Sequence, residues 1–135
     1  VAPYMKQQGW GRIINIGGLA ARSAGAFSGM RNLALTHFTK TLSNELGPHG
    51  ITVNIIHPGA TRTERTGPMQ KSQAREQDLT IEEVERKAAA GIDIRRLVES
   101  EEIAYLATFL ASPKASAITG EAIAAGGGVG SAVFQ

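Results

Sequence analysis

Phe27 and Arg31 lie four residues apart in the stretch GAFSGMRNLALTHFTK, residues 25–40. Side chains at this spacing are neighbours on one face of a helix. A proton donor next to a cation would form a catalytic acid–base pair there. Phenylalanine, however, has no titratable proton, and arginine keeps its charge because its pKa lies above about 12. The pair is therefore either one packed turn of helix or the place of a catalytic pair that cannot move a proton.

Four other side chains are candidates for acid–base chemistry. Ser23 and Ser28 are the nearest hydroxyls, and Tyr4 and Tyr105 are the only phenols of the sequence. Ser23 could lie at a strand-to-helix turn, where serine more often caps the helix. Tyr105 falls inside a predicted helix, where a half-buried packing role is the default. None of the four supports a mechanism on its own.

The composition excludes several classes of function. The chain has 135 residues, enough for one modest domain, and its net charge is only +2 with both signs interspersed, which favours neither nucleic acid nor a membrane surface. Cysteine is absent, and the three histidines, His37, His49 and His57, are not spaced as metal ligands. No apolar run reaches the roughly 20 residues that span a bilayer. We expect a cytoplasmic protein without a metal, and the start on Val1 suggests that the sequence begins inside a longer chain.

Two stretches have the composition of buried strands. RIINI, residues 12–16, is followed by two glycines, and ITVNIIH, residues 51–57, is followed by Pro58-Gly59. Unbroken apolar and β-branched runs are typical of parallel strands that are covered on both faces. Asn54 within the second run is expected to satisfy a buried backbone group.

The segment between these two runs predicts a long helix that ends at Gly47 and Pro48. Its apolar residues recur every three or four positions, and an amphipathic helix packs such a stripe against its core. The stripe consists of Phe27, Met30, Ala34, Phe38, Leu42 and Leu46. Strand, helix and strand in this order predict a crossover in a parallel sheet.

The remaining segments complete an α/β pattern. Residues 1–9 are typical of the last turns of a helix capped by Gly9, and residues 60–78 of a long polar loop or mobile lid. Thr80 and Glu83 predict a capping box for a helix that ends at Gly91. Ser100 is the predicted N-cap of another helix, whose inward residues are Ile103, Leu106, Ala107 and Leu110. The stretch ITGEAIAAGGG, residues 118–128, is predicted to form a turn, a last short strand and a glycine-rich exit.

Four stretches in this order resemble the C-terminal half of the short-chain dehydrogenase/reductase family. GRIINIGG is similar to the fifth strand of the family, and FSGMRNLALTHFTKTLSNEL to the helix that normally opens Tyr-x-x-x-Lys. GITVNIIHPGATRT is similar to the sixth strand and its Pro-Gly-x-x-x-Thr loop, and ITGEAIAAGGG to the last strand. The resemblance implies a Rossmann-like doubly wound parallel sheet, of which residues 1–135 would form a single partial domain with the last three strands and their flanking helices.

The resemblance also implies chemistry. Members of the family transfer a hydride between NAD or NADP and a carbonyl or alcohol substrate. The tyrosine gives or takes the proton, the lysine lowers the pKa of the tyrosine and holds the nicotinamide ribose, and a serine hydrogen-bonds the substrate oxygen. The positions that this resemblance assigns to the cofactor are Arg31, Pro58, Gly59, Ala60, Thr61 and Thr63. A plain strand-ending turn at Pro58-Gly59 and a solvated or ion-paired Arg31 are the alternatives.

The sequence departs from the family at all three catalytic positions. Phe27 stands at the tyrosine position, Arg31 at the lysine position, and Gly18, or Gly17, at the serine position. The glycine-rich phosphate-binding turn of the family does not occur in this sequence. We therefore expect that the chain as given is catalytically impaired and that cofactor binding by this chain alone is weak.

Two further hypotheses follow. The first is a pseudoenzyme whose scaffold acts by ligand binding or by self-association, and the second is a longer parent protein that takes its proton from water or from the substrate. An apolar strand without a neighbour on one edge associates readily with other chains. We therefore expect a homo-oligomer formed through the edge of the strand at 12–16 or through the helix that begins at Phe27. The sequence specifies no substrate and no choice between NAD and NADP.

Overall fold

The computed structural model describes residues 1–22 and 27–130, so Ser23 lies outside the described residues. The chain packs as two compact units. The first comprises Val1–Pro58 and Ala104–Ala124, and the second comprises Gly59–Ile103 and the residues from Ala125 on. The two units are described separately, and the single partial domain expected for residues 1–135 stays a prediction.

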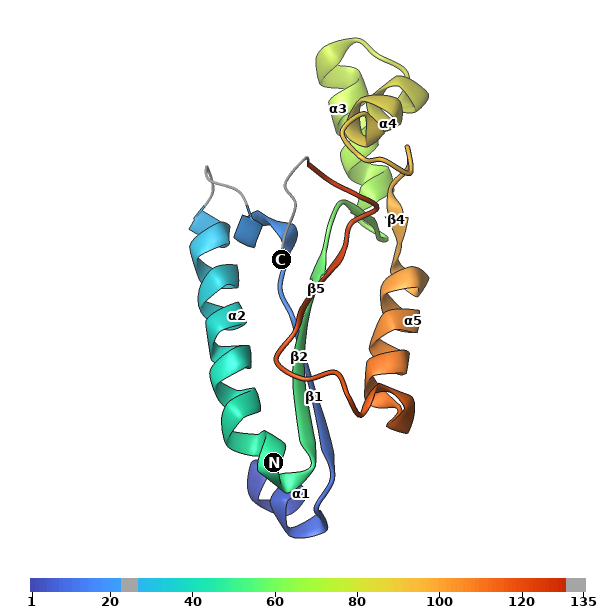
Figure 1. The fold of residues 1–135 in the computed structure, drawn as a ribbon. Coiled ribbons are helices and arrows are strands. Elements are labelled where there is room, and N and C mark those ends of the chain that lie inside the picture. Colours follow the sequence, from blue (N-terminus) through green and yellow to red (C-terminus); the bar gives the residue numbers. More distant parts are fainter. Residues whose placement is uncertain (23–26, 131–135) are drawn as a thin grey trace. The chain divides into compact units, whose positions relative to one another are not determined.

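The first unit is built on a three-stranded sheet, with the strands in the order β1-β2-β5 (Figure 1). The strands are β1 (Gly11–Ile16), β2 (Ile51–Pro58) and β5 (Ala122–Ala125). β1 and β2 are parallel, in a register that runs from Gly11 opposite Ile51 to Ile16 opposite Ile56. The predicted strands and the crossover between them are confirmed. β2 is buried along almost its whole length, whereas β1 is only half-buried because it lies at the edge of this sheet.

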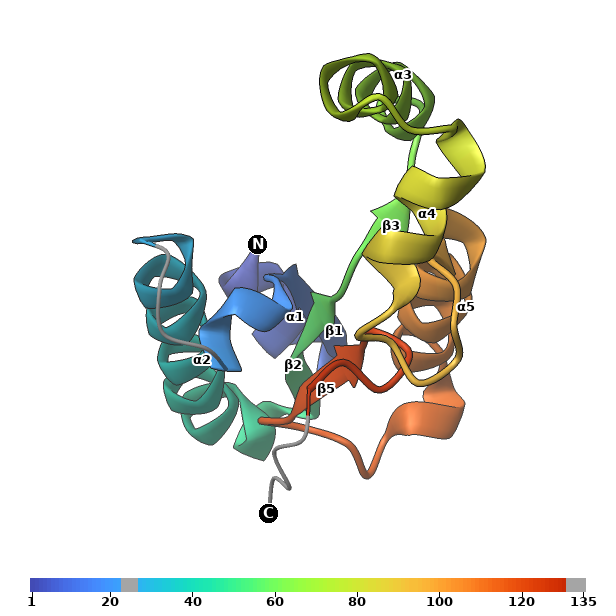
Figure 2. The same ribbon diagram turned by 90° about the horizontal axis from the view of Figure 1, so that it is seen from above.

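Two helices flank this sheet, and α2 (Phe27–Leu46) forms the connection from β1 to β2. Viewed from above, α2 lies on one face of the sheet, and the part of α5 (Ser100–Ala111) that belongs to the first unit lies on the other (Figure 2). A small core joins the end of α2 to the sheet through Leu46, Ile51 and Val53, with Met5 of α1 (Ala2–Gln8) packed against it. Gly9 caps α1 in the left-handed conformation, as predicted.

The predicted core face of α2 is confirmed only at its C-terminal end, where Leu42 and Leu46 pack in the core, and is wrong for the rest of the helix. Phe27, Met30 and Phe38 of the apolar stripe are 91%, 71% and 52% exposed. The buried residues of the helix are instead mostly small or polar, namely Gly29, Asn32, Thr39, Ser43 and Leu46. Periodicity identifies two opposite stripes of a helix, and here hydrogen bonds such as Asn15 Nδ2 to Thr39 Oγ1, at 2.9 Å, decide which stripe meets the sheet.

The second unit holds short elements around two helices. Its strands β3 (Thr61–Arg62) and β4 (Val98–Glu99) pair in parallel, and its helices are α3 (Thr66–Gln77) and α4 (Ile81–Ala89). The prediction of a loop over residues 60–78 is wrong, because most of that segment forms α3. Strong helix formers dominate α3, and only Gln70 and Ala74 are buried, so no apolar stripe marked the helix in the sequence.

Local chemistry sets the ends of the other helices. The Thr80 N–H donates to Glu83 Oε2 at 2.8 Å and the Glu83 N–H donates to Thr80 Oγ1 at 3.2 Å, which confirms the capping box of α4. α5 begins at Ser100, so the predicted N-cap is the first helical residue, and its hydroxyl donates to Glu101 instead. The four predicted inward residues of α5 are the less exposed ones, with Leu110 fully buried. No helix of the described residues is both long and apolar enough to cross a membrane.

Candidate functional site

The carboxyl ends of β1 and β2 meet the first turns of α2. β1 is followed by Gly17 and Gly18, and β2 ends with His57 and Pro58. The Gly17 N–H continues the strand pairing by donating to the Ile56 carbonyl at 2.8 Å. In parallel α/β sheets, ligands bind outside the carboxyl ends of the strands. This end of the sheet is therefore the candidate site of the first unit.

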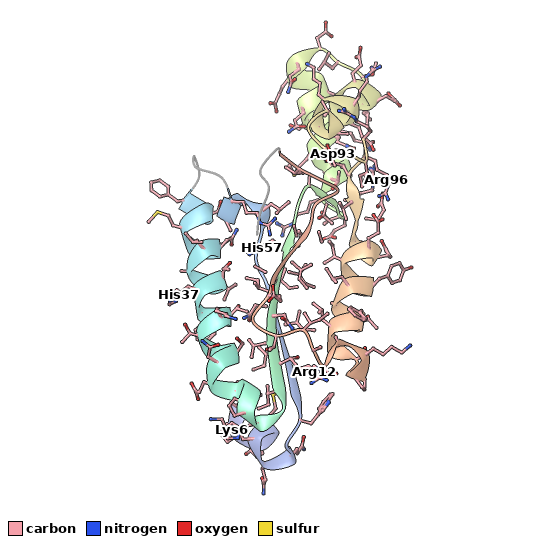
Figure 3. All side chains as sticks on the ribbon, in the orientation of Figure 1. Lys6, Arg12, His37, His57, Asp93 and Arg96 are labelled. Carbon is pink, nitrogen blue, oxygen red and sulfur yellow. The ribbon has the colours of Figure 1, made fainter. Side chains whose placement is uncertain are left out.

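His57 is the central side chain of this end of the sheet, where Figure 3 labels it. Its side chain is buried, with 1% exposed. Nδ1 accepts a hydrogen bond from the Gly18 N–H at 2.9 Å, and Nε2 lies 2.9 Å from Thr36 Oγ1 on α2. Because Nδ1 accepts, the ring proton of a neutral His57 lies on Nε2 and is donated to Thr36. Thr36 in turn donates to the Asn32 carbonyl at 2.9 Å.

Burial lowers the pKa of His57 below 6.5, and the positive charge of Arg22 lowers this pKa further. Arg22 follows the candidate turn in the chain, in the short 3₁₀ helix Leu19–Arg22, and donates to the Ala122 carbonyl at 3.2 Å. The neutral ring is therefore the form that the fold favours. A neutral ring is also the only form that can accept the Gly18 N–H, because both nitrogens of an imidazolium are donors.

A side chain at Gly17 would clash with His57, and one at Gly18 would contact Asn32 closely. A Cβ at Gly17 would lie 2.6 Å from His57 Nδ1, and a Cβ at Gly18 would lie 3.0 Å from Asn32 Nδ2. A serine at position 17 would therefore require His57 to move, and one at position 18 would require a shift of Asn32 by a few tenths of an ångström. The buried His57 ring therefore occupies the space that a side chain at position 17 would need.

The structure links two of the three predicted catalytic positions. Arg31 Nη2 donates to Asn32 Oδ1 at 3.4 Å, and Asn32 Nδ2 donates to the Gly18 carbonyl at 3.2 Å. Phe27 begins α2 and is 91% exposed, so its ring packs little against the described residues. Of the alternative phenols, Tyr4 and Tyr105 are both exposed. None of these observations tests the catalytic assignment of Gly18, Phe27 and Arg31, which stays a prediction.

The predicted cofactor loop is divided between the units. Pro58 is the last residue of β2, and Gly59 begins the second unit. There the Gly59 N–H donates to the Ala125 carbonyl at 3.1 Å, and Thr61 Oγ1 donates to the Gly59 carbonyl at 3.1 Å. The Ala60 carbonyl accepts from the Val98 N–H at 3.0 Å. The turn is thus fixed by backbone bonds to Ala125 and Val98 and by the Thr61 hydroxyl, and the exposed Thr63 side chain remains accessible to a ligand.

A cavity of about 360 Å³ lies within the second unit, beside this turn. Residues of the turn, of α3 and of α4 line it, among them Thr61, Thr63, Gln70 and Val84. Gln70 and Val84 are buried, with 7% and 5% exposed. Its size and mostly apolar wall fit a small organic molecule. In the described part of the chain, no cluster of three or more potential metal ligands occurs.

The sequence analysis did not identify Asn32 or Thr36 as site residues, and it predicted only a structural role for His57. A signal was present, because Asn32, Thr36, Thr39 and Ser43 recur at helical spacing and form a polar stripe. The expectation for Asn54 is confirmed. Its Nδ2 donates to the Ile118 carbonyl at 2.8 Å and its Oδ1 accepts from the Glu121 N–H at 3.1 Å.

Comparisons with known proteins give a consistent result. A family model described as enoyl-(acyl carrier protein) reductase matches residues 1–130. The NADPH-dependent reductase BacG of Bacillus subtilis is 41% identical over 127 residues, which are 92% of this chain and 49% of BacG. The short-chain reductase protein NovJ of Streptomyces niveus is 37% identical over 133 residues, 95% of this chain and 48% of NovJ.

The structural comparison agrees with the sequence matches. The crystal structure of YwfH, an NADPH-dependent reductase involved in bacilysin biosynthesis, superposes with a TM-score of 0.85 at 38% identity, over 98% of this chain and 52% of YwfH. The chain spans about half the length of the curated relatives that it matches.

Proposed function

Because the chain belongs to the short-chain dehydrogenase/reductase family of NAD(P)-dependent reductases, we propose that it is the substrate-side part of such a reductase and has lost acid–base catalysis by a phenol. The observation that carries this proposal is Phe27, whose ring has no titratable proton and which stands at the position of the family's proton donor. Arg31 keeps a charge but does not relay protons, and Gly18 has no hydroxyl. The cavity of the second unit supports a substrate-side role. A cytoplasmic location stays a prediction.

The residues present fit parts of a nicotinamide dinucleotide. In the first unit, Arg31 is exposed and would hold a ribose hydroxyl or a phosphate. In the second unit, considered by itself, the exposed Thr63 hydroxyl would be accessible to a carboxamide. NAD(P)H supplies a hydride when it is bound. The chain's own contribution would be to bind and orient, because the described residues place no phenol or free hydroxyl at positions 18, 27 or 31.

The test is an assay of the whole 135-residue chain with NADPH and a panel of ketones and β-keto esters. We expect oxidation of NADPH no faster than without protein, since loss of a general acid costs about 10²- to 10⁴-fold in rate. We also expect no micromolar binding in a titration followed by NADPH emission. A tyrosine-containing family reductase is the positive control. Ketone reduction that is abolished by Arg31→Gln would overturn the proposal.

A second candidate function is assembly. The exposed apolar face of α2, formed by Phe27, Met30, Ala34 and Phe38, and the edge of β1 are both available for contacts with another chain. We propose that the chain self-associates through one of these surfaces. An exposed apolar stripe of this kind marks interaction sites in soluble proteins. The assembly would serve a non-catalytic scaffold as well as a reductase.

A further inference from the structure

We propose that neutral His57 is the positioning residue of the candidate site, and that a proton taken up by its ring breaks the hydrogen bond between His57 and the Gly18 N–H and so loosens the Gly17–Gly18 turn. The inference goes beyond the proposed function, because it requires neither NAD(P) nor turnover. It concerns a buried titratable side chain that the reductase chemistry does not use.

The first step of the argument is the geometry of the imidazole. Both ring nitrogens are used, one by the Gly18 N–H and the other by Thr36 Oγ1, each at 2.9 Å. His57 therefore joins the turn after β1 to the third turn of α2. A Cβ at Gly17 would lie 2.7 Å from Cε1 of the same ring, so the ring also fills the space beside the turn.

The second step is the effect of a proton. Protonation of Nδ1 replaces an acceptor by a donor, and the ring would then direct an N–H at the N–H of Gly18. The amide loses its partner while the charge is created in a site that is 99% buried, since 1% of His57 is exposed. Breaking the contact and turning the ring or the turn toward water relieves both costs.

The third step is the set of charges around the ring. Arg22, after the turn, acts on the ring through its charge, and Arg31, on α2, contacts Asn32 of the network, and both of these charges are positive. The neighbouring residues of β1 and β2, Asn15 and Ile16, Ile55 and Ile56, are uncharged. No carboxylate is among these residues to stabilise an imidazolium. The pKa of His57 is accordingly lowered, by burial first and by Arg22 second.

The direction of the pH dependence follows. Because the pKa of folded His57 lies below its unfolded value of 6.5, the contact is complete above pH 6.5. It is lost as the pH falls through the lower, folded pKa. The Gly18 N–H is thus held by His57 at neutral pH and loses this partner in acid, while the bond from Asn32 to the Gly18 carbonyl remains.

The experiment follows the ring nitrogens of His57 and the Gly18 amide by NMR of the ¹⁵N-labelled 135-residue chain between pH 8 and pH 4.5. We expect the Gly18 amide shift to change with the same midpoint as the His57 ring, below 6.5. We also expect the Gly18 amide to lose about tenfold of its protection against hydrogen exchange, the effect of one lost hydrogen bond. The amides of the β2 core should keep their shifts.

Two variants serve as controls. His57→Gln removes the titration but keeps a side-chain oxygen that can accept the Gly18 N–H, so the Gly18 response should disappear. His37→Gln removes an exposed histidine of α2 and should leave the response unchanged. A Gly18 amide that ignores the His57 titration would overturn the inference, and so would loss of all core amides at the same pH. If His57→Gln does not fold, the comparison of ring and amide in the unaltered chain decides.

Discussion

Replacing Gly17 by alanine is expected to lower the free energy of unfolding by about 2–3 kcal/mol, the cost of overpacking a filled interior. The new Cβ would lie 2.6 Å from His57 Nδ1, and the ring cannot move into solvent because 1% of it is exposed. Either the ring or the turn must shift, and a shift breaks the hydrogen bond from the Gly18 N–H. Urea unfolding followed by circular dichroism measures the effect.

Two comparisons separate this cause from a general effect of alanine. Gly47→Ala is the matched control, because a Cβ there meets nothing within 4 Å. In a His57→Ala background the Gly17→Ala substitution should cost about 1–2 kcal/mol less, since contacting residues couple by this order. Equal costs in the two backgrounds would show that His57 is not what excludes a side chain at position 17.

The second large effect is expected on assembly. We predict that the chain self-associates through the exposed apolar face of α2, and that Phe38→Asp raises the dissociation constant about thirtyfold or more, as for the loss of an apolar hot spot. Phe38 is 52% exposed, so the aspartate is tolerated in the folded monomer. Light scattering after size-exclusion chromatography measures the mass as a function of concentration.

The control for this prediction is Lys71→Asp, which changes an exposed side chain of α3 in the second unit to the same acid. It should leave the mass unchanged. A chain that is a monomer at high concentration contradicts self-association altogether. An oligomer that persists in Phe38→Asp assigns the contact to the edge of β1 instead.

Patterns that depend on neighbours in sequence predicted the fold well. The apolar runs at 12–16 and 51–57 became the parallel strands β1 and β2, and Thr80 with Glu83 formed the capping box. The resemblance to the reductase family is confirmed by a match over residues 1–130. The apolar runs and the capping box are each read from one short segment, and the family resemblance is read from the order of four such segments.

The features that were predicted wrongly or not at all depend on contacts between segments, which the sequence does not show. The stripe of Phe27, Met30 and Phe38 has the right period for a core face, yet the sheet contacts the polar stripe on the other side of α2. Residues 66–77 form a helix with so little burial that no period marks it. The contact between Gly17 and His57 joins residues 40 positions apart, so only the folded chain reveals it.

The polar stripe of α2, which faces the sheet, makes the helix resistant to sliding along the sheet. An apolar helix can slip along a sheet by one turn at small cost, because one aliphatic contact replaces another. Here a slip would separate Asn15 from Thr39, Gly18 from Asn32 and His57 from Thr36, three directional bonds broken together. These bonds fix the register of α2 on the sheet and therefore hold Arg31, next to Asn32, at a fixed position relative to the Gly17–Gly18 turn.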